Sequence, residues 1–276
     1  MDEDDKTIIS FNLPSVLQDL TDKEKHSIPN FEHCINQQQF HIRMANSKGR
    51  REAASLLIKK MYGWRGYATE SMIDTSSSTS SSTSSSISNT AESSASSAPE
   101  LESPMNKITL FAEMEGEIVG TMTLCLDDYE DGLPADEIFH DKLDELRHQG
   151  CRLCEPSRLA IDKGLSNRVF AALIHISYIY AHNIHGYSDY VIEVNPRHVM
   201  FYKRMLGFKD FGAERPCVRV GAPAVLLRLE LDYMKQQIDK FGGVMAQNDT
   251  ERSFYPHFFP SMDEAGITDR LIQGRN

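Results

Sequence analysis

Apolar and polar residues alternate along the chain in two patterns, which predict helices and strands. Two signals indicate four helices. Apolar side chains recur near helical spacing in 51–62 (REAASLLIKKMY), and glycines that can end a helix follow at Gly150, Gly186 and Gly207. The predicted helices are 51–62, 136–148, 166–185 and 199–205. Short runs rich in β-branched and other apolar residues are typical of strands. The predicted strands are 107–114, 117–126, 152–161, 190–194 and 224–231.

The order of these elements predicts an α/β fold. A helix is followed by a hairpin turning at Glu115-Gly116, and helices and strands then alternate up to a closing strand. This order predicts a central mixed β-sheet flanked by helices, with its first half antiparallel. Ligands are expected near the C-terminal ends of adjacent strands.

A serine-rich stretch interrupts the pattern. Residues 76–97 contain 14 serines and 3 threonines. The segment therefore has too few apolar side chains to offset the conformational entropy that it would lose on ordering. We interpret 72–104 as a disordered insertion, which is either a lid or partner-binding segment or a tolerated surface loop. It would lie inside a domain spanning 36–245, with an N-terminal tail or peripheral segment at 1–35 and a C-terminal tail at 246–276.

Composition narrows the class of protein. The formal net charge of −11 and a pI near 5.4 disfavour general binding to nucleic acid or to an anionic membrane surface. No apolar run approaches the length of a membrane span, and the acidic N-terminus does not resemble a secretory signal. Five scattered cysteines favour reduced thiols over a disulfide framework. We therefore expect a cytoplasmic protein.

The segment 194–208 (VNPRHVMFYKRMLGF) carries the first chemical signal. A strand ends, Asn195 begins a helix, and Tyr202 precedes a Gly-Phe pair. This resembles the late signature of the GNAT acyltransferases, although His198 stands where that family usually has alanine and one extra residue precedes Gly207. The resemblance implies that Tyr202 lies beside the thioester sulfur and acts as general acid, because its phenol can protonate a departing thiolate. The alternative is a tyrosine that only packs on the sheet.

The segment 154–162 (CEPSRLAID) carries the second signal. Glu155 and Arg158 are three apart, so on a regular strand they would face opposite ways, and a β-bulge is needed to bring them together. The segment resembles the acyl-homoserine-lactone synthases and, more closely, the N-acyl amino acid synthases of the FeeM kind. The resemblance implies that Glu155 and Arg158 organise the amine and the carboxylate of an amino acid acceptor. A structural ion pair between the two is the alternative.

The resemblance covers about 40–70 and 107–235 and implies further roles. Arg43, Trp64 and Asn195 become candidate substrate-binding residues, with packing roles as the alternative for the first two. The loop 162–168 (DKGLSNR) has one glycine and lacks the pyrophosphate-binding motif of acetyl-CoA-dependent relatives. A donor on the phosphopantetheine arm of an acyl carrier protein needs no such motif, and Lys59, Lys60 and Arg65 could bind that partner or form a solvated helix face.

The remaining motifs carry little weight. Cys151 and Cys154 form a lone CxxC without a second pair, and His175, His182 and His185 lack an acidic partner at ligand spacing, so we expect no metal. No cofactor is expected beyond the acyl thioester donor. The sequence therefore predicts an enzyme that moves a long-chain acyl group from acyl carrier protein to an amino acid amine. The alternatives are an acetyl-CoA-dependent acetyltransferase and a non-catalytic acyl-binding module.

Overall fold

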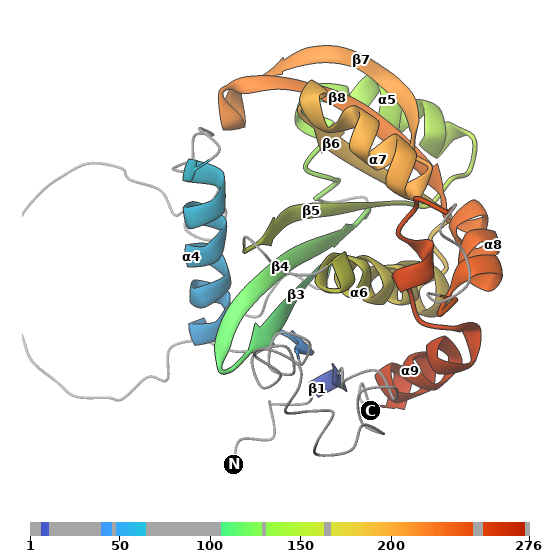
Figure 1. Cartoon of the computed structure of the whole chain (residues 1–276). Helices are drawn as coiled ribbons and strands as arrows, with labels where there is room; N and C mark the ends of the chain where they lie inside the picture. The colour runs from blue at the N-terminus through green and yellow to red at the C-terminus, as the bar shows by residue number, and fades with distance from the viewer. Residues whose placement is uncertain are drawn as a thin grey trace, which may run out of the picture.

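The computed structural model describes residues 7–10, 40–45, 48–64, 106–128, 131–162, 167–244 and 251–273. The predicted serine-rich insertion at 72–104 lies outside these residues. Within them, one mixed sheet runs in the order β1-β2-β3-β4-β5-β6-β8-β7 (Figure 1). Its strands are β1 Thr7–Ser10, β2 His41–Met44, β3 Lys107–Met114, β4 Glu117–Leu126, β5 Leu153–Ile161, β6 Asp189–Val194, β7 Lys209–Cys217 and β8 Ala222–Glu230.

The antiparallel half of the sheet follows the sequence pattern. The predicted hairpin is confirmed: β3 and β4 pair antiparallel and turn at Glu115 and Gly116, whose φ angles are 53° and 84°. Two successive positive φ values match the twist of the flanking strands, which is why a glycine suits the second position. β2 and β5 pair antiparallel on either side of this hairpin.

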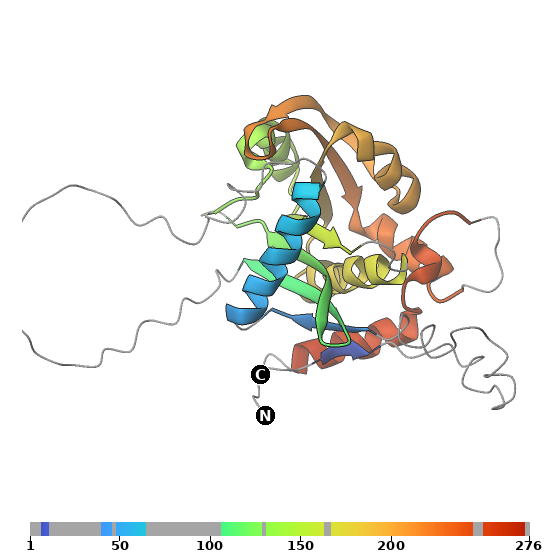
Figure 2. The ribbon, with the colours of Figure 1, turned by 60° about the vertical axis from the view of Figure 1, so that its left-hand side comes forward.

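Helices cover both faces of the sheet. The α-helices are α4 Lys48–Trp64, α5 Asp136–His148, α6 Asn167–Tyr178, α7 Val199–Leu206, α8 Leu231–Phe241 and α9 Ser261–Gln273. Short helices are η2 Ile179–Ile184 (π), η3 Pro196–His198, η4 Val218–Val220 and η5 Tyr255–His257. Adjacent residues of β5 point to opposite faces: Leu153 packs with the α5 cluster and Cys154 with the α6 cluster. Ala160 packs with α4 and pairs with Thr121 of β4, which lies on the same face as Cys125 of the α5 cluster, so α4 and α5 share one face. Figure 2 shows α4 lying across this face.

The C-terminal segment departs from the prediction. Residues 251–273 were expected within a tail at 246–276, but Phe254, Tyr255, Phe258 and Phe259 are all buried in the main core. The hydroxyl of Tyr255 donates a hydrogen bond to the carbonyl of Leu206 at 2.6 Å. The tail prediction is wrong for these residues. Aromatic side chains clustered in a short turn bury apolar area without any helical or strand periodicity, so the pattern carried no signal.

The second half of the sheet contains a strand that was not predicted. The strand predicted at 224–231 is β8, which lies between β6 and β7. The edge strand β7 (KDFGAERPC) was not predicted, because most of its side chains are exposed or half-exposed and it lacks an apolar run. The helix predicted to end at 185 is α-helical only to Tyr178 and continues as the π-helix η2.

Strands β5 and β6 are parallel neighbours that soon separate. Their pairing is confined to Leu153 with Asp189 and Cys154 with Tyr190. Beyond this point β5 continues its pairing with β4, and β6 continues its pairing with β8 (Figure 1). The sheet therefore opens in its middle, toward the C-terminal ends of two adjacent strands, where the sequence predicted a ligand site.

Candidate active site

The predicted β-bulge lies on β5 just beyond the point of separation. Thr121 of β4 pairs with Ala160 and Thr123 with Ser157, so Arg158 and Leu159 together face one residue of β4. Arg158 has a φ of 51°, unusual for a residue other than glycine. An extra residue in one strand redirects the side chains that follow it. The bulge that the spacing of Glu155 and Arg158 required is confirmed.

Glu155 is a buried carboxyl on the α5 face of β5. Its side chain is 3% exposed, and its Oε2 accepts a hydrogen bond of 2.8 Å from the backbone N–H of Ala135, immediately before α5. Burial raises the pKa of Glu155 to about 8, and the charge of Glu193 adds to the rise, whereas the Ala135 bond and the charge of Arg219 oppose it. A carboxyl with this pKa can exchange a proton near neutral pH.

The charge of Arg158 acts on a thiol that lies next to Glu155. The thiol of Cys125 is the cross-strand neighbour of Glu155. Burial raises the pKa of Cys125 to about 11; the negative charge of Glu155 adds to the rise, and the positive charges of Lys107 and Arg158 oppose it. Both members of the predicted pair therefore act on one thiol.

Tyr202 lies in α7, on the other face of the sheet. It is half-buried against the main core, which also includes Leu159 of β5 and Val194 of β6. Its ring packs edge-on against Phe201 and Phe208, with centroid separations of 5.2 Å and 5.9 Å. The predicted acid and the predicted carboxyl thus lie on opposite faces of a sheet that is open between β5 and β6.

The side chain of Asn195 stabilises the connection between β6 and α7 through two hydrogen bonds. Its Oδ1 accepts a hydrogen bond from the backbone N–H of Arg197 at 3.2 Å, and its Nδ2 donates to the carbonyl of Pro223 at 3.3 Å. The prediction that Asn195 begins the helical segment is confirmed, because it caps η3 and leads directly into α7. Both ends of its amide are used within the protein, so its predicted contact with substrate stays a prediction.

The other predicted site residues, where the structure describes them, belong to β2 and α4. Arg43 is on β2, in register with Phe111, and its Nε lies 3.7 Å from Glu113 Oε2. Two strands separate β2 from β5. Trp64 ends α4, and its side chain lies outside the described residues, as does all of Arg65. Lys60 forms an ion pair with Asp162 at 3.0 Å, whereas Lys59 is exposed.

Two charged residues beside Glu155 were not predicted. Arg219 of η4 donates from Nη2 to Glu193 Oε2 at 2.8 Å and from Nη1 to the carbonyl of Pro134 at 3.3 Å. The Glu193 side chain is 7% exposed. A carboxylate inside the apolar strand run YVIEV was a signal for Glu193. No comparable pattern marked Arg219, which lies in the turn after the unpredicted strand β7.

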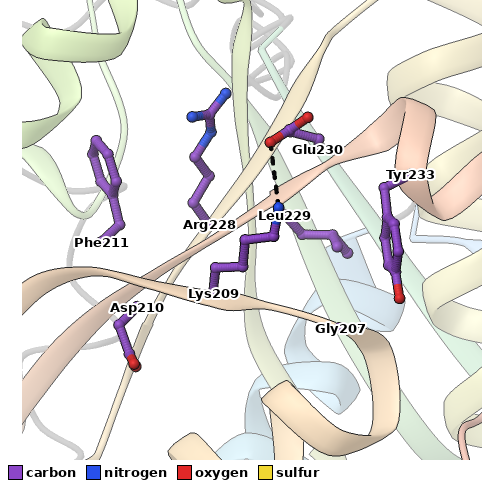
Figure 3. Close-up of a pocket in the computed structure, with 8 residues that line it drawn as sticks. All are labelled: Gly207, Lys209, Asp210, Phe211, Arg228, Leu229, Glu230 and Tyr233. Atoms are coloured by element: carbon purple, nitrogen blue, oxygen red, sulfur yellow. Dashed lines mark ion pairs between the residues drawn. The ribbon is translucent and has the colours of Figure 1, made fainter.

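A surface pocket lies at the edge of the sheet over β7 and β8 and contains none of the site residues described above (Figure 3). It is lined by Gly207, Lys209, Asp210, Phe211, Arg228, Leu229, Glu230 and Tyr233. Within the described part of the chain, no cluster of three or more His, Cys, Asp or Glu side chains could hold a metal, and no helix is long and apolar enough to cross a membrane.

Comparison with known proteins identifies the family. The family model of the N-acyl amino acid synthase FeeM matches residues 53–230, more than half of the chain. This protein belongs to the FeeM family of N-acyl amino acid synthases. It is therefore an acyltransferase. The match includes α5, the bulge of β5, α7 and the turn that carries Arg219.

One solved structure supports this family assignment, and others show a weaker likeness. The structure of FeeM, an N-acyl amino acid synthase from uncultured soil microbes, has 26% identity and a TM-score of 0.56, and the match covers 71% of this chain and 93% of that one. An acyl-CoA N-acyltransferase from Pseudomonas aeruginosa is 11% identical, covering 68% of this chain and 97% of that one with a TM-score of 0.42. The AHL synthase LasI is 20% identical, and the match covers 45% of this chain and 64% of that one with a TM-score of 0.33. No curated protein sequence matches significantly. The match to FeeM confirms the predicted fold, a central mixed sheet flanked by helices.

Proposed function

We propose that this member of the FeeM family transfers a long-chain acyl group from the thioester of an acyl carrier protein to the amine of an amino acid. The observation that carries this proposal is the position of Glu155. It is a buried carboxyl with a pKa of about 8, beside a β-bulge, where two parallel strands separate. Amino acids carry an ammonium group at neutral pH, and an acyl transfer must first remove a proton from it.

The proposed reaction uses the two faces of the open sheet. The Glu155 carboxylate takes a proton from the acceptor ammonium, and the neutral amine attacks the thioester carbonyl. Backbone N–H groups at the bulge, near residues 158–160, stabilise the oxyanion that forms. As the C–S bond breaks, Tyr202 on the opposite face donates its proton to the thiolate. The tyrosine then regains a proton from the positively charged nitrogen that becomes the amide nitrogen. The products are an amide and a free thiol.

Arg158 is proposed to bind the acceptor's carboxylate. A guanidinium offers two parallel donors to a carboxylate, and the bulge gives Arg158 a conformation that an unbroken strand would not. Its charge acts on the same thiol as that of Glu155. One acceptor could therefore place its carboxylate near Arg158 and its ammonium near Glu155, which favours an α-amino acid over a simple amine.

The carrier-protein donor is supported by the sequence of the loop 162–168, which has one glycine and lacks the pyrophosphate motif. Most of this loop lies outside the described residues. The basic surface proposed for the carrier is smaller than the sequence indicated, because Lys60 is paired with Asp162. Lys59 remains exposed on α4.

The proposal is tested with purified protein and a matched pair of donors. Long-chain acyl carrier protein and acetyl-CoA are supplied at equal concentration with a mixture of the twenty amino acids, and N-acyl products are identified by mass spectrometry. We expect N-acyl amino acids from the carrier donor, at a rate that far exceeds any acetylation and that falls about 10²–10⁴-fold in Glu155→Gln. Faster turnover with acetyl-CoA would make the protein an acetyltransferase, and bound but unconverted acyl chains would make it a binding module.

A further inference from the structure

One peptide group lies between the Glu155 carboxyl and a cation. The N–H of the Pro134–Ala135 peptide donates to Glu155 Oε2 at 2.8 Å, and the carbonyl of the same peptide accepts from Arg219 Nη1 at 3.3 Å. A hydrogen bond to a carbonyl oxygen polarises its peptide group and makes the N–H a stronger donor. Arg219 therefore favours the ionised form of Glu155 through this peptide as well as through space.

The turn that carries this peptide is fixed by other charged groups. Asp136 Oδ2 accepts a hydrogen bond of 2.7 Å from the N–H of Leu133, which closes the turn. Arg147 donates to both oxygens of Asp136 at 2.7 Å and also binds Asp127 at 2.8 Å and 2.9 Å. The Pro134–Ala135 peptide thus has one stable orientation, and the Glu155 carboxyl has a fixed donor.

Glu193 holds the other side of the Arg219 guanidinium. It lies on β6, on the α5 face, since its neighbours Ile192 and Val194 face the main core. Its bond to Arg219 Nη2 is 2.8 Å. The two buried carboxyls therefore come from the two strands that separate. Arg219 of η4 binds Glu193 directly and binds the peptide group that donates to Glu155. Removing Glu193 leaves the positive charge of Arg219 beside Glu155, and removing Arg219 leaves the negative charge of Glu193.

We infer that the Glu193–Arg219 pair is a positioning device for Glu155, which orients its carboxyl on the Pro134–Ala135 peptide and balances its charge. The catalytic consequence rests on the proposed role of Glu155 as the base. Other ionisable groups act on Glu155 or on its immediate partners. They are Asp136 and Glu137 of α5, Cys125 of β4, Lys107 of β3, Cys217 of β7 and Arg158 of β5 itself.

The two members of the pair should move the titration of Glu155 in opposite directions. The negative charge of Glu193 raises the pKa of Glu155 and the positive charge of Arg219 lowers it. Glu193→Gln should therefore shift the titration to lower pH, and Arg219→Met to higher pH, each by about one pH unit. Arg219→Lys keeps the charge but loses the planar fork, so its shift should be smaller than that of Arg219→Met.

The titration can be read without reference to activity. In protein labelled with ¹³C at the glutamate side-chain carboxyl, the resonance of Glu155 is identified by its loss in Glu155→Gln and is followed from pH 5 to 10. Arg215→Met is the matched control, because Arg215 also joins α5 through a carbonyl, that of Ile138, and a carboxylate, that of Asp141. Glu230→Gln is the control for removal of a carboxylate elsewhere in the sheet. Neither control should move the resonance.

The outcomes separate this inference from the proposed function. Opposite shifts in Glu193→Gln and Arg219→Met, matched by the acidic limb of the kcat/KM profile, support both. Opposite shifts with an unmoved kcat/KM profile support the positioning pair and refute Glu155 as the base. If neither variant moves the resonance, or if both move it the same way, the pair does not position Glu155. Should Arg219→Met fail to fold, the near-isosteric Glu193→Gln decides alone.

Discussion

Replacing Glu155 by glutamine should stabilise the protein at alkaline pH. The variant keeps an oxygen that can accept the 2.8 Å hydrogen bond from Ala135 and changes the side-chain volume little. What it removes is the ability to ionise inside the α5 cluster. A charged carboxylate in such surroundings is costly, whereas a neutral amide with a hydrogen bond is tolerated.

The size and sign follow from the pKa of Glu155. Its folded value is about 8, against an ordinary value of 4.5. Between these two values the folded chain holds a proton that the unfolded chain has lost, so the free energy of unfolding of the wild type falls as pH rises. At 1.36 kcal/mol per unit, the wild type loses about 4–5 kcal/mol by pH 8 and no more above it. Glu155→Gln escapes this loss.

Thermal unfolding from pH 5 to pH 9 measures the difference directly. The two proteins should melt together near pH 5, and the variant should melt roughly 10 °C or more higher at pH 9. Its turnover should nevertheless fall about 10²–10⁴-fold, because the proposed base is gone. Glu230→Gln, at an exposed site, should show neither effect. A melting difference that does not change with pH, or a variant that is less stable at pH 9, would refute the assignment of a raised pKa.

Three further substitutions test individual residues. Tyr202→Phe should lower turnover about 10²–10⁴-fold without affecting the melting temperature, and activity within a few-fold of wild type would make it a packing residue. Arg158→Lys should raise the KM for the amino acid while leaving that for the acyl donor unchanged, because the bidentate fork is lost; equal changes in both would argue against a carboxylate site. Asn195→Ala should reduce the free energy of unfolding by about 1 kcal/mol through loss of the η3 cap, and a raised KM without that loss would instead favour substrate contact.

The local elements could be predicted because each has its own signal in the chain. The hairpin is marked by Glu115-Gly116, and the helical segment formed by η3 and α7 is marked by Asn195 at its beginning and Gly207 at its end. The bulge was predictable for a chemical reason, since a carboxylate and a guanidinium three apart cannot share a face of a regular strand. Its position was therefore set by residues that the resemblance had already singled out.

Long-range pairings could not be predicted in the same way. Nothing in β7 or β8 alone says that the later strand pairs with β6, since that order depends on burial against α5 and the main core. The partners of Glu155 have the same difficulty. Ala135, Glu193 and Arg219 come from three separate elements, and their meeting is a property of the folded sheet.

The buried aromatic residues after α8 have a consequence for how the domain is delimited. The family match ends at residue 230, yet Phe254, Phe258 and Phe259 complete the main core, and His175 of α6 binds both the Phe259 N–H and the Glu264 carboxylate. A chain cut at the family boundary would leave this apolar surface open to water and an imidazole without its partners. The folded domain is thus longer than the segment that matches the family, and fragments that end at residue 230 should aggregate.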